Sequence, residues 1–540
     1  MKDLVEALDL ATPLFDQIAS ISGVPGVSLG VFHQGDVVFR YNYGFRDLEA
    51  QLPTTSTTIY PLASLTKAFT SMVYGSLVAD GLVDWHSPIR DILPEFRSTA
   101  DEVGRLASAV DILSHRTGVP GGETLYFHGQ PLLNDSDHPN QFRGQMLYNN
   151  LGYALVAMAM SRKTGQSYEE LLESRLLQPL GLTRTGLSFD PRTTEDMAKC
   201  YLVTEEKEAV ENPRPLFLAN SVMVAVGGLR SSVDDLLKFY RTLLRDASQL
   251  ATTADGTHQS SLKELRTILS GFAPLGGQRT GLLESSYGLG WIRSQLPSEL
   301  GSMGLNSWLL GKMPVVGRGA PSRLALYHQG NLPGATTAVY LFPETQSGIV
   351  VLENAYGLSD VPDWIAQIII HILFDMPTTT DYAKLAEQAV SNFQQHRRKT
   401  ASDLSRLPRT DSEPASPHRL LGDYENAAEC FFLRISQREN DLKLSFQGFP
   451  EEEFDLVHLY DDVYSWYPSS RELAQRGRTK PRQVFLNDDD TPAIERTWQL
   501  GNIAMLGWRP LTSLRRSSGS FAEYSMPVSI EFNTASNSVP

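Results

Sequence analysis

The chain has 540 residues, of which 41% are hydrophobic and 20% are charged, and its formal net charge is −15. This length exceeds what one ordinary hydrophobic core accommodates, so two globular units are expected. The negative charge repels phosphate backbones and argues against nucleic acid as a partner. Apolar runs stay well short of the roughly 18 consecutive residues that a membrane-spanning helix needs, so no membrane association is expected.

The start of the chain and its cysteines predict a reduced, cytoplasmic protein. Acidic residues occur within residues 1–7, whereas a signal peptide begins with a basic region followed by an apolar block. The two cysteines, Cys200 and Cys430, are far apart and form neither a disulfide framework nor a CxxC pair. The eleven histidines show no HExxH spacing. No metal and no cofactor is therefore expected.

The pattern of apolar residues predicts a mixed unit of strands and helices. Residues 26–41 alternate apolar and polar side chains, which is typical of a β-hairpin. In residues 64–79 the apolar side chains recur on one helical face, and Gly81 follows as a stop signal. Further strands are expected at residues 323–327, 335–342 and 348–352, with a helix at residues 363–374. Strands at both ends of the region, with helices between them, indicate one α/β unit of the α+β kind.

The composition changes after this unit. Residues 396–418 are polar, charged and rich in proline, as in a linker that ends a domain of residues 1–395. Short strand-like runs separated by turn residues follow in residues 419–525, which predicts a small β-barrel or sandwich. Residues 526–540 are rich in Ser and Asn and read as a tail.

A GxSxG pattern at Gly26–Gly30 is a decoy. In α/β-hydrolases this motif works as a strand, a tight turn and a helix that together expose the serine. Here Ser28 lies inside an alternating run that continues as a hairpin. We interpret Ser28 as an ordinary strand residue.

The SxxK pattern occurs at Ser64–Lys67 and again at Ser260–Lys263. The second copy lies in a polar stretch, where a surface position is a sufficient explanation. Ser64 opens an apolar-faced helix, where backbone N–H groups and the helix dipole favour developing negative charge. Residues three apart share a helix face, and a buried lysine can take a proton, so Lys67 could activate the Ser64 hydroxyl. A helix-capping serine beside a surface lysine explains these residues equally well.

Two further motifs are expected in a site of this kind: a YxN pattern, and a strand-end tripeptide for which both a literal KTG and His328–Gly330 are candidates. YxN occurs at Tyr148–Asn150 and at Tyr424–Asn426, and the first copy stands between a polar loop and an expected helix, where a tyrosine hydroxyl could face a cleft or the ring could simply join the core. The literal KTG at Lys163–Gly165 closes that helix, where lysine complements the dipole and glycine caps. His328–Gly330 ends a strand instead, and strand-edge backbone can donate an N–H to an oxyanion.

The order of these motifs resembles the family of class C β-lactamases, serine D-Ala-D-Ala carboxypeptidases and related esterases. The resemblance covers about residues 15–375 and implies a β-lactamase/transpeptidase-like fold, with an antiparallel sheet and a helical subdomain. It is supported by further ordered stretches: Gly81-Leu82-Val83-Asp84, Leu113-Ser114-His115-Arg116-Thr117-Gly118, Asn150-Leu151-Gly152-Tyr153, Gly227-Gly228-Leu229-Arg230-Ser231 and Tyr287-Gly288-Leu289-Gly290-Trp291.

The resemblance implies a role for each motif residue. Ser64 would attack a carbonyl and become acylated, while Lys67 and Tyr148 share the proton transfers. Asn150 would orient Lys67 or a substrate amide. The remaining implied roles are an oxyanion hole from the backbone N–H groups of Ser64 and Asn331, and a hydrogen bond from His328, next to Gly330, toward Tyr148 or the substrate.

One residue departs from the family pattern and bears on the substrate. Many family members have lysine where this chain has His328, and a neutral histidine grips a substrate carboxylate less well than a lysine does. This favours a small-molecule ester or amide without that carboxylate, and a hydrolase. An acyltransferase that uses the same acyl-enzyme with an alcohol, amine or thiol, and a non-catalytic binding protein, are the alternatives.

Overall fold

The computed structural model describes residues 2–96, 101–119, 142–189, 194–212, 221, 223–252, 261–275, 283–405, 420–425, 432–439, 441–446, 448–460, 463–466, 468–477, 497–499 and 509–510. Contacts divide the chain into two compact units. The first comprises Met1–Asp411 with Ser465–Thr497, and the second comprises Ser412–Tyr464 with Trp498–Pro540.

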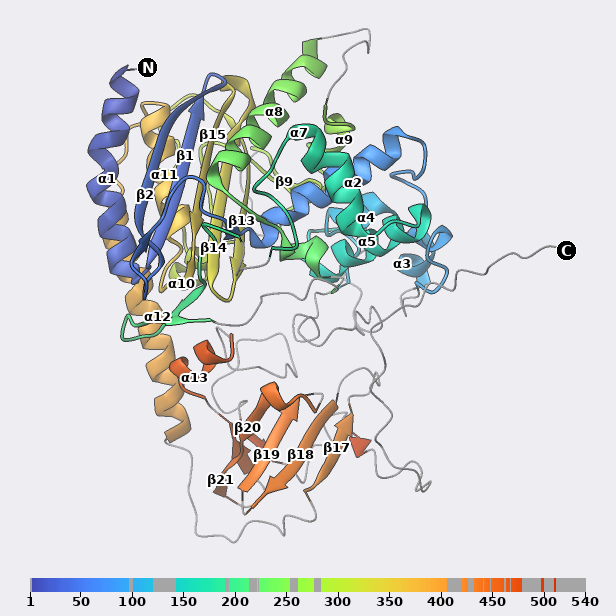
Figure 1. Ribbon diagram of the computed structural model, residues 1–540, viewed down its shortest axis with the longest axis vertical. Coiled ribbons are helices and arrows are strands. Elements are labelled where there is room, and N and C mark those ends of the chain that lie inside the picture. The colour runs from blue at the N-terminus through green and yellow to red at the C-terminus, as the bar shows by residue number, and fades with distance from the viewer. Residues whose placement is uncertain are drawn as a thin grey trace, which may run out of the picture. The chain divides into compact units, whose positions relative to one another are not determined.

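A large antiparallel sheet forms the centre of the first unit (Figure 1). Within the described residues its order is β3-β2-β1-β15-β14-β13-β10-β9-β8. Strands that are far apart in sequence are neighbours in this sheet: β1, near the start of the chain, pairs with β15. The strands span Gly26–His33 (β1), Asp36–Asp47 (β2), Leu52–Pro53 (β3), Ala273–Pro274 (β8), Ser285–Tyr287 (β9), Ile292–Gln295 (β10), Leu324–Leu332 (β13), Ala335–Phe342 (β14) and Ser347–Glu353 (β15).

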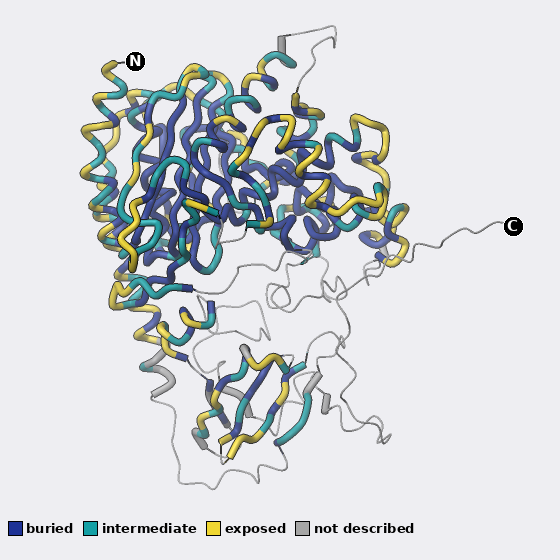
Figure 2. Tube along the Cα trace, in the orientation of Figure 1, coloured by how far each residue is buried: buried dark blue, intermediate teal, exposed yellow. Residues whose placement is uncertain are grey.

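Helices cover both faces of this sheet (Figure 1). Helices α1 (Lys2–Ser22) and α11 (Val361–Leu373) pack on one face, and α8 (Val233–Thr252) packs on the other. Alternate residues of a strand point to opposite faces. In β15, Val350 joins the core beside α8 and Val351 joins the core beside α11. Figure 2 shows the sheet as a buried layer between them.

The core on the α8 side continues into a helical subdomain. Its principal helix for the site is α2 (Thr66–Ala79), which packs against α5 (Asn150–Thr164). The other helices of the first unit are α3 (Asp101–Leu106), α4 (Ala109–Leu113), α6 (Tyr168–Leu172), α7 (Gln178–Leu180), α9 (Leu265–Ile268), α10 (Leu305–Leu310), α12 (Tyr382–Ser405) and α13 (Ser470–Gln475). Its short strands are β4 (Tyr60–Pro61), β5 (Tyr201–Val203), β6 (Ala209–Glu211), β7 (Arg230–Ser231), β11 (Ser298–Glu299), β12 (Val315–Val316) and β16 (Ala355–Tyr356).

These elements confirm the fold class expected from the sequence, an antiparallel sheet with a helical subdomain. The predicted hairpin turns at Gln34 and Gly35, which both adopt positive φ. Gly81, with φ of 71°, follows the end of α2. Gly165, at φ of 72°, caps α5, so the literal KTG ends a helix as predicted. Ser28 lies buried in β1 and its hydroxyl bonds the backbone of Thr55, as an ordinary strand residue does.

The second unit contains an antiparallel sheet. Among its described residues the order is β20-β19-β18-β17-β24. Its apolar side chains Leu433, Leu444 and Phe446 are buried. The strands span Gly422–Glu425 (β17), Phe432–Arg438 (β18), Asp441–Phe446 (β19), Glu453–Asp455 (β20) and Arg509–Pro510 (β24), and β21 (Val457–Tyr460), β22 (Val463–Ser465) and β23 (Thr497–Gln499) form a separate small sheet.

The predicted domain limits differ from the structure at two places. Helix α12 continues to Ser405, through the first residues of the predicted linker 396–418. Its Gln, Arg, Lys and Ala residues are good helix formers, and Arg397 is buried and donates to Ser470. Residues 465–497 cluster with the first unit, although the sequence placed them within 419–525. Helix α13 packs on β6, where Arg471 pairs with Glu208.

Among the described helices, none combines the length and the apolar character that crossing a bilayer demands.

Candidate active site

Ser64 stands on a strained turn just before α2. The turn is a short 3-10 helix, η1 (Ala63–Leu65), whose neighbours Leu62, Ala63 and Leu65 are buried while Ser64 is half-buried. Ala63 adopts φ of 51°, a left-handed conformation that is unfavourable for a residue with a Cβ atom. The Leu62 N–H donates to the Leu229 carbonyl at 2.8 Å and anchors the start of the turn. The buried residues on either side of Ser64 therefore fix the position of its backbone.

Lys67 lies one turn further along and reaches back to Ser64. Its Nζ donates to Ser64 Oγ at 2.9 Å and to the Val226 carbonyl at 3.1 Å. The Lys67 side chain is fully buried, which contradicts a surface-charge interpretation of this residue. Nζ also lies 5.0 Å from the centre of the Tyr148 ring and 5.5 Å from that of Tyr153.

Tyr148 contacts the same oxygen. Its hydroxyl donates to Ser64 Oγ at 3.0 Å, and the residue lies immediately before α5. Asn149 begins that helix as its N-cap, with a side chain that accepts from the Gly152 N–H. Tyr148 lies 84 residues beyond Ser64 in the sequence, so the fold brings the YxN segment to the segment that carries both Ser64 and Lys67.

Gly330 lies against the Ser64 turn. A Cβ atom there would lie 2.5 Å from the Leu62 carbonyl oxygen, 2.8 Å from the Ala63 Cβ and 2.4 Å from the Thr337 hydroxyl. The Thr337 hydroxyl donates to the same Leu62 carbonyl at 3.0 Å. Glycine is therefore required for β13 to approach η1 this closely.

The two asparagines of the predicted site make fewer contacts. Asn150 is the first residue of α5, and its Oδ1 is buried without a hydrogen-bond partner among the described residues. Of the two roles predicted for Asn150, orienting Lys67 or a substrate amide, this oxygen makes no hydrogen bond to Lys67 in the described chain. Asn331 follows Gly330 on β13, and its Oδ1 is likewise buried without a partner in the described part of the chain.

His328 has partners other than those predicted. Its Nδ1 donates to the Gln329 carbonyl at 2.6 Å, so Nε2 is free of a proton in the neutral ring and accepts from the Tyr287 hydroxyl at 2.9 Å. Burial, and next the charge of Lys67, lower the pKa of His328 to about 3. Both ring nitrogens are thus occupied, and the ring is neutral at physiological pH.

Three residues complete the surroundings of Lys67 and were not assigned a role from the sequence. They are the buried residues His115, Tyr153 and Tyr287, and the centroid of the His115 ring lies 5.3 Å from that of Tyr153 and 4.7 Å from that of Tyr287. Each belongs to a stretch that carries the family resemblance, so the signal was present. What the sequence lacked was the tertiary contact that brings the three stretches together.

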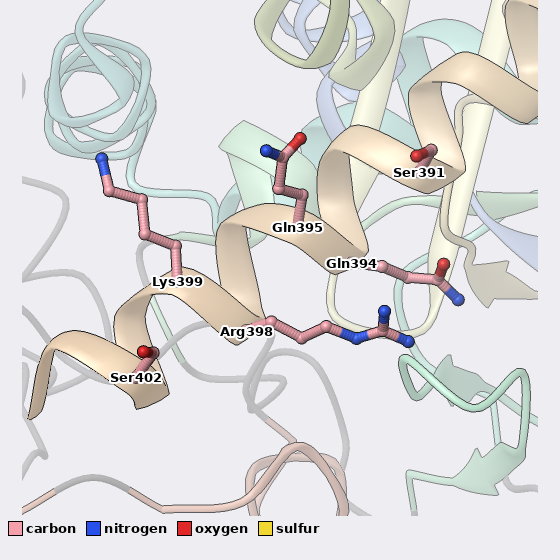
Figure 3. Close-up of a pocket in the computed structure, with 6 residues that line it drawn as sticks. All are labelled: Ser391, Gln394, Gln395, Arg398, Lys399 and Ser402. Carbon is pink, nitrogen blue, oxygen red and sulfur yellow. The ribbon is translucent and has the colours of Figure 1, made fainter. Parts of the chain in front are cut away.

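Two cavities recorded in the described residues lie apart from Ser64, which lines neither. One is a polar groove on α12 (Figure 3). Arg398 and Lys399 project from it in different directions, beside Ser391, Gln394, Gln395 and Ser402. The other is a small apolar cavity beside Asn149, lined also by Phe96, Val103, Ile112, Thr117, Val119, Gly152 and Leu155. The polar segment that precedes Tyr148, residues 121–145, lies largely outside the described residues.

Residues 12–371 match the family model "Beta-lactamase". The chain belongs to this β-lactamase family. Its relatives include a penicillin-binding protein 4* of Bacillus subtilis, 22% identical over 64% of this chain and 71% of that protein. A β-lactamase of Escherichia coli is 23% identical over 64% of this chain and 86% of that protein.

Another relative in the β-lactamase family carries the name of a hydrolase. It is the unguisins hydrolase of Aspergillus campestris, 26% identical over 61% of this chain and 58% of that protein. Among solved structures, an octameric penicillin-binding protein homologue from Pyrococcus abyssi shares the fold, with a TM-score of 0.53 and 21% identity over 86% of this chain and 94% of that chain. The chain is thus a serine-hydrolase-like member of the family, as its motifs indicated.

The buried, neutral His328 predicts a pH dependence of stability. In the unfolded chain a histidine titrates near pH 6.5, whereas His328 in the folded protein titrates near 3. The unfolded state therefore binds more protons between these values, and the free energy of unfolding falls as the pH is lowered from 6.5. The slope for this one residue reaches about 1.4 kcal/mol per pH unit.

Denaturant unfolding of the wild type and of His328→Asn at pH 7 and pH 5 measures this effect. The variant should lose less stability than the wild type over that interval. His86→Asn, at an exposed histidine, serves as the control and should behave as the wild type does. Equal pH dependence in all three proteins would contradict the assignment of a neutral, buried His328.

Proposed function

We propose that this protein is a serine hydrolase that cleaves a small-molecule ester or amide through an acyl-enzyme at Ser64. The observation that carries the proposal is the convergence of Lys67 Nζ and Tyr148 OH on Ser64 Oγ, at 2.9 and 3.0 Å. Nucleophilic serines are activated by a base within hydrogen-bond reach. Membership of a family that includes a named hydrolase supports the reaction class.

The first half of the reaction transfers the acyl group to Ser64. With the Lys67 amine unprotonated, the 2.9 Å contact lets the Ser64 hydroxyl pass its proton to the Lys67–Tyr148 pair while Oγ bonds the substrate carbonyl carbon. The tetrahedral intermediate then expels the alcohol or amine. That leaving group receives the proton from the pair, through Tyr148 on its side of Oγ.

The second half releases the acid. Water adds to the acyl carbon and gives its proton to the same pair, and the bond between the carbon and Ser64 Oγ breaks. Oγ recovers its proton, and the site returns to its starting state. One water is consumed, and one acid and one alcohol or amine are formed.

The oxyanion would be held by the backbone N–H groups of Ser64 and Asn331. The close approach of β13 to η1 at Gly330 supports this, since it brings the residue after Gly330 beside the Ser64 turn. Two fixed N–H donors stabilise the developing charge without reorganising in the transition state. Asn150 would contact the substrate amide through its Oδ1, which has no hydrogen-bond partner among the described residues.

His328 bears on the substrate class. Its ring is neutral and both nitrogens are engaged, so it offers no fixed positive charge to a carboxylate. We therefore propose substrates whose reacting acyl group is not flanked by a carboxylate.

Ser64→Ala should abolish hydrolysis and leave the fold intact. Ser64 caps neither η1 nor α2 with its side chain, so the variant should fold. Because the buried Lys67 Nζ loses one acceptor, the free energy of unfolding should fall by about 1–3 kcal/mol. Intact mass spectrometry and peptide mapping after exposure to a fluorophosphonate should show one adduct, on Ser64. Ser76→Ala, on the same helix, is the control and should keep both labelling and activity. Modification of Ser28 or Ser260 with Ser64 unmodified would refute the proposal.

Lys67 and Tyr148 should behave as one unit in kinetics. Lys67→Met and Tyr148→Phe should each lower kcat/KM by about 10²- to 10⁴-fold, and the double variant should lose little more, because both serve one proton transfer. Tyr153→Phe is the matched control, since the Tyr153 hydroxyl donates to the Leu113 carbonyl and should contribute little. Strictly multiplicative losses in the double variant would mean that one of the two acts elsewhere.

A penicillin with a free carboxylate should be a poorer substrate than an uncharged ester. A charge-assisted hydrogen bond to a carboxylate contributes about 1.5–3 kcal/mol, or roughly ten- to a hundredfold in selectivity. We expect a butyrate ester to be cleaved faster than a penicillin, and the methyl ester of that penicillin to react at least as fast as its free acid. A free acid that reacts tenfold faster than its methyl ester would show that a cation holds the carboxylate.

A further inference from the structure

His115 packs against Tyr148, the tyrosine to which the proposed mechanism gives a proton transfer, and its backbone is in a left-handed conformation. It follows the end of α4 and is fully buried, with φ of 59°. A left-handed backbone costs a residue with a Cβ atom free energy and persists only where its surroundings fix it. This conformation lets the carbonyl and the ring of His115 both bond the segment that carries Tyr148.

His115 contacts three successive residues that include Tyr148. Its carbonyl accepts the Leu147 N–H at 2.8 Å, and its Nδ1 accepts the Asn149 N–H at 3.1 Å. Between these two bonds the imidazole packs on the Tyr148 ring, with centroids 4.3 Å apart. One residue thus holds the backbone on both sides of Tyr148 and the ring of Tyr148 itself.

The arrangement requires a neutral imidazole with its proton on Nε2. Nδ1 is an acceptor, so the proton of the neutral ring lies on Nε2, which is buried without a hydrogen-bond partner among the described residues. Burial, and next the charge of Lys67, lower the pKa of His115 far below its usual range. The rings of Tyr153 and Tyr287 lie 5.3 and 4.7 Å away and confine the imidazole.

We propose that His115 is a positioning residue that sets the hydroxyl of Tyr148 at hydrogen-bond distance from Ser64 Oγ. The inference rests on the proposed function, in which Tyr148 moves a proton. Residues 146–149 belong to neither a helix nor a strand, so their course depends on such local bonds. A displacement of the Tyr148 hydroxyl by about 1 Å can cost on the order of a hundredfold in rate.

Two variants separate the contributions of the acceptor and the ring. His115→Phe keeps an aromatic ring and removes the Nδ1 acceptor. His115→Asn keeps a short acceptor and tolerates the left-handed backbone, but removes the ring. Each is made in the wild type and in the Tyr148→Phe background, and kcat, KM and Tm are measured with an activated ester.

His115→Phe should lower kcat by about ten- to a hundredfold with KM nearly unchanged, and His115→Asn should recover part of that loss. In the Tyr148→Phe background the same changes should lower kcat less than about twofold, since no hydroxyl remains to position. Any loss of Tm should be equal in the two backgrounds, because it reports packing alone.

An equal loss of kcat in both backgrounds would overturn the inference, and so would wild-type kcat in a folded variant at residue 115. If His115→Phe fails to fold, His115→Asn decides by the same comparison. Fluorophosphonate labelling separates a failure of the proposed function from a failure of the role proposed for His115. An unlabelled Ser64 in the wild type refutes the proposed function, whereas a labelled Ser64 with background-independent losses refutes only the role of His115.

Discussion

The burial of Lys67 is the constraint on which the site depends. A buried amine is costly unless its hydrogen bonds are satisfied, so the chain must bring acceptors to it. Ser64 Oγ supplies one and the Val226 carbonyl supplies another. That carbonyl belongs to a π-helical turn, η5 (Val224–Gly228), whose shape leaves backbone oxygens facing α2.

Two threonines of α2 also form hydrogen bonds with the segment that supplies the Val226 carbonyl. Thr70 donates to the Ala225 carbonyl at 2.6 Å, and the Thr66 hydroxyl accepts the Leu229 N–H at 3.2 Å. The first turns of α2 are thus held by hydrogen bonds to residues 225–229, the segment before β7. Ser64 is held by the same contacts, because its turn is continuous with the helix. A rigid base for the nucleophile follows from satisfying the polar groups around Lys67.

Much of the site was predictable because its parts are local in sequence. Ser64 and Lys67 are three residues apart, and Tyr148 stands at the start of a helix that Asn149 caps. The partners of His328 could not be predicted, because Tyr287 reaches it from β9 through the pairing of β9, β10 and β13. The role of His115 depends on contacts with residues more than thirty positions away.

The fold was predictable to a similar degree. Alternation identified β1 and β2, and apolar runs identified β14 and β15, since strands buried on both faces leave that signal. The end of α12 was less accessible, because its last turns are polar and composition alone resembles a linker. Only contacts such as that of Arg397 with Ser470 reveal that the helix continues.

The glycine at position 330 has a consequence for altering this protein by mutation. The space between β13 and the Ser64 turn is filled by the Leu62 carbonyl, the Ala63 Cβ and the Thr337 hydroxyl, and it leaves no room for a side chain at position 330. Selection for a new substrate therefore has no adjustable part at this contact. Libraries that randomise Leu62, Gly330 or Thr337 are therefore expected to yield mainly destabilised variants, and substitutions that alter the choice of substrate have to be sought away from this contact.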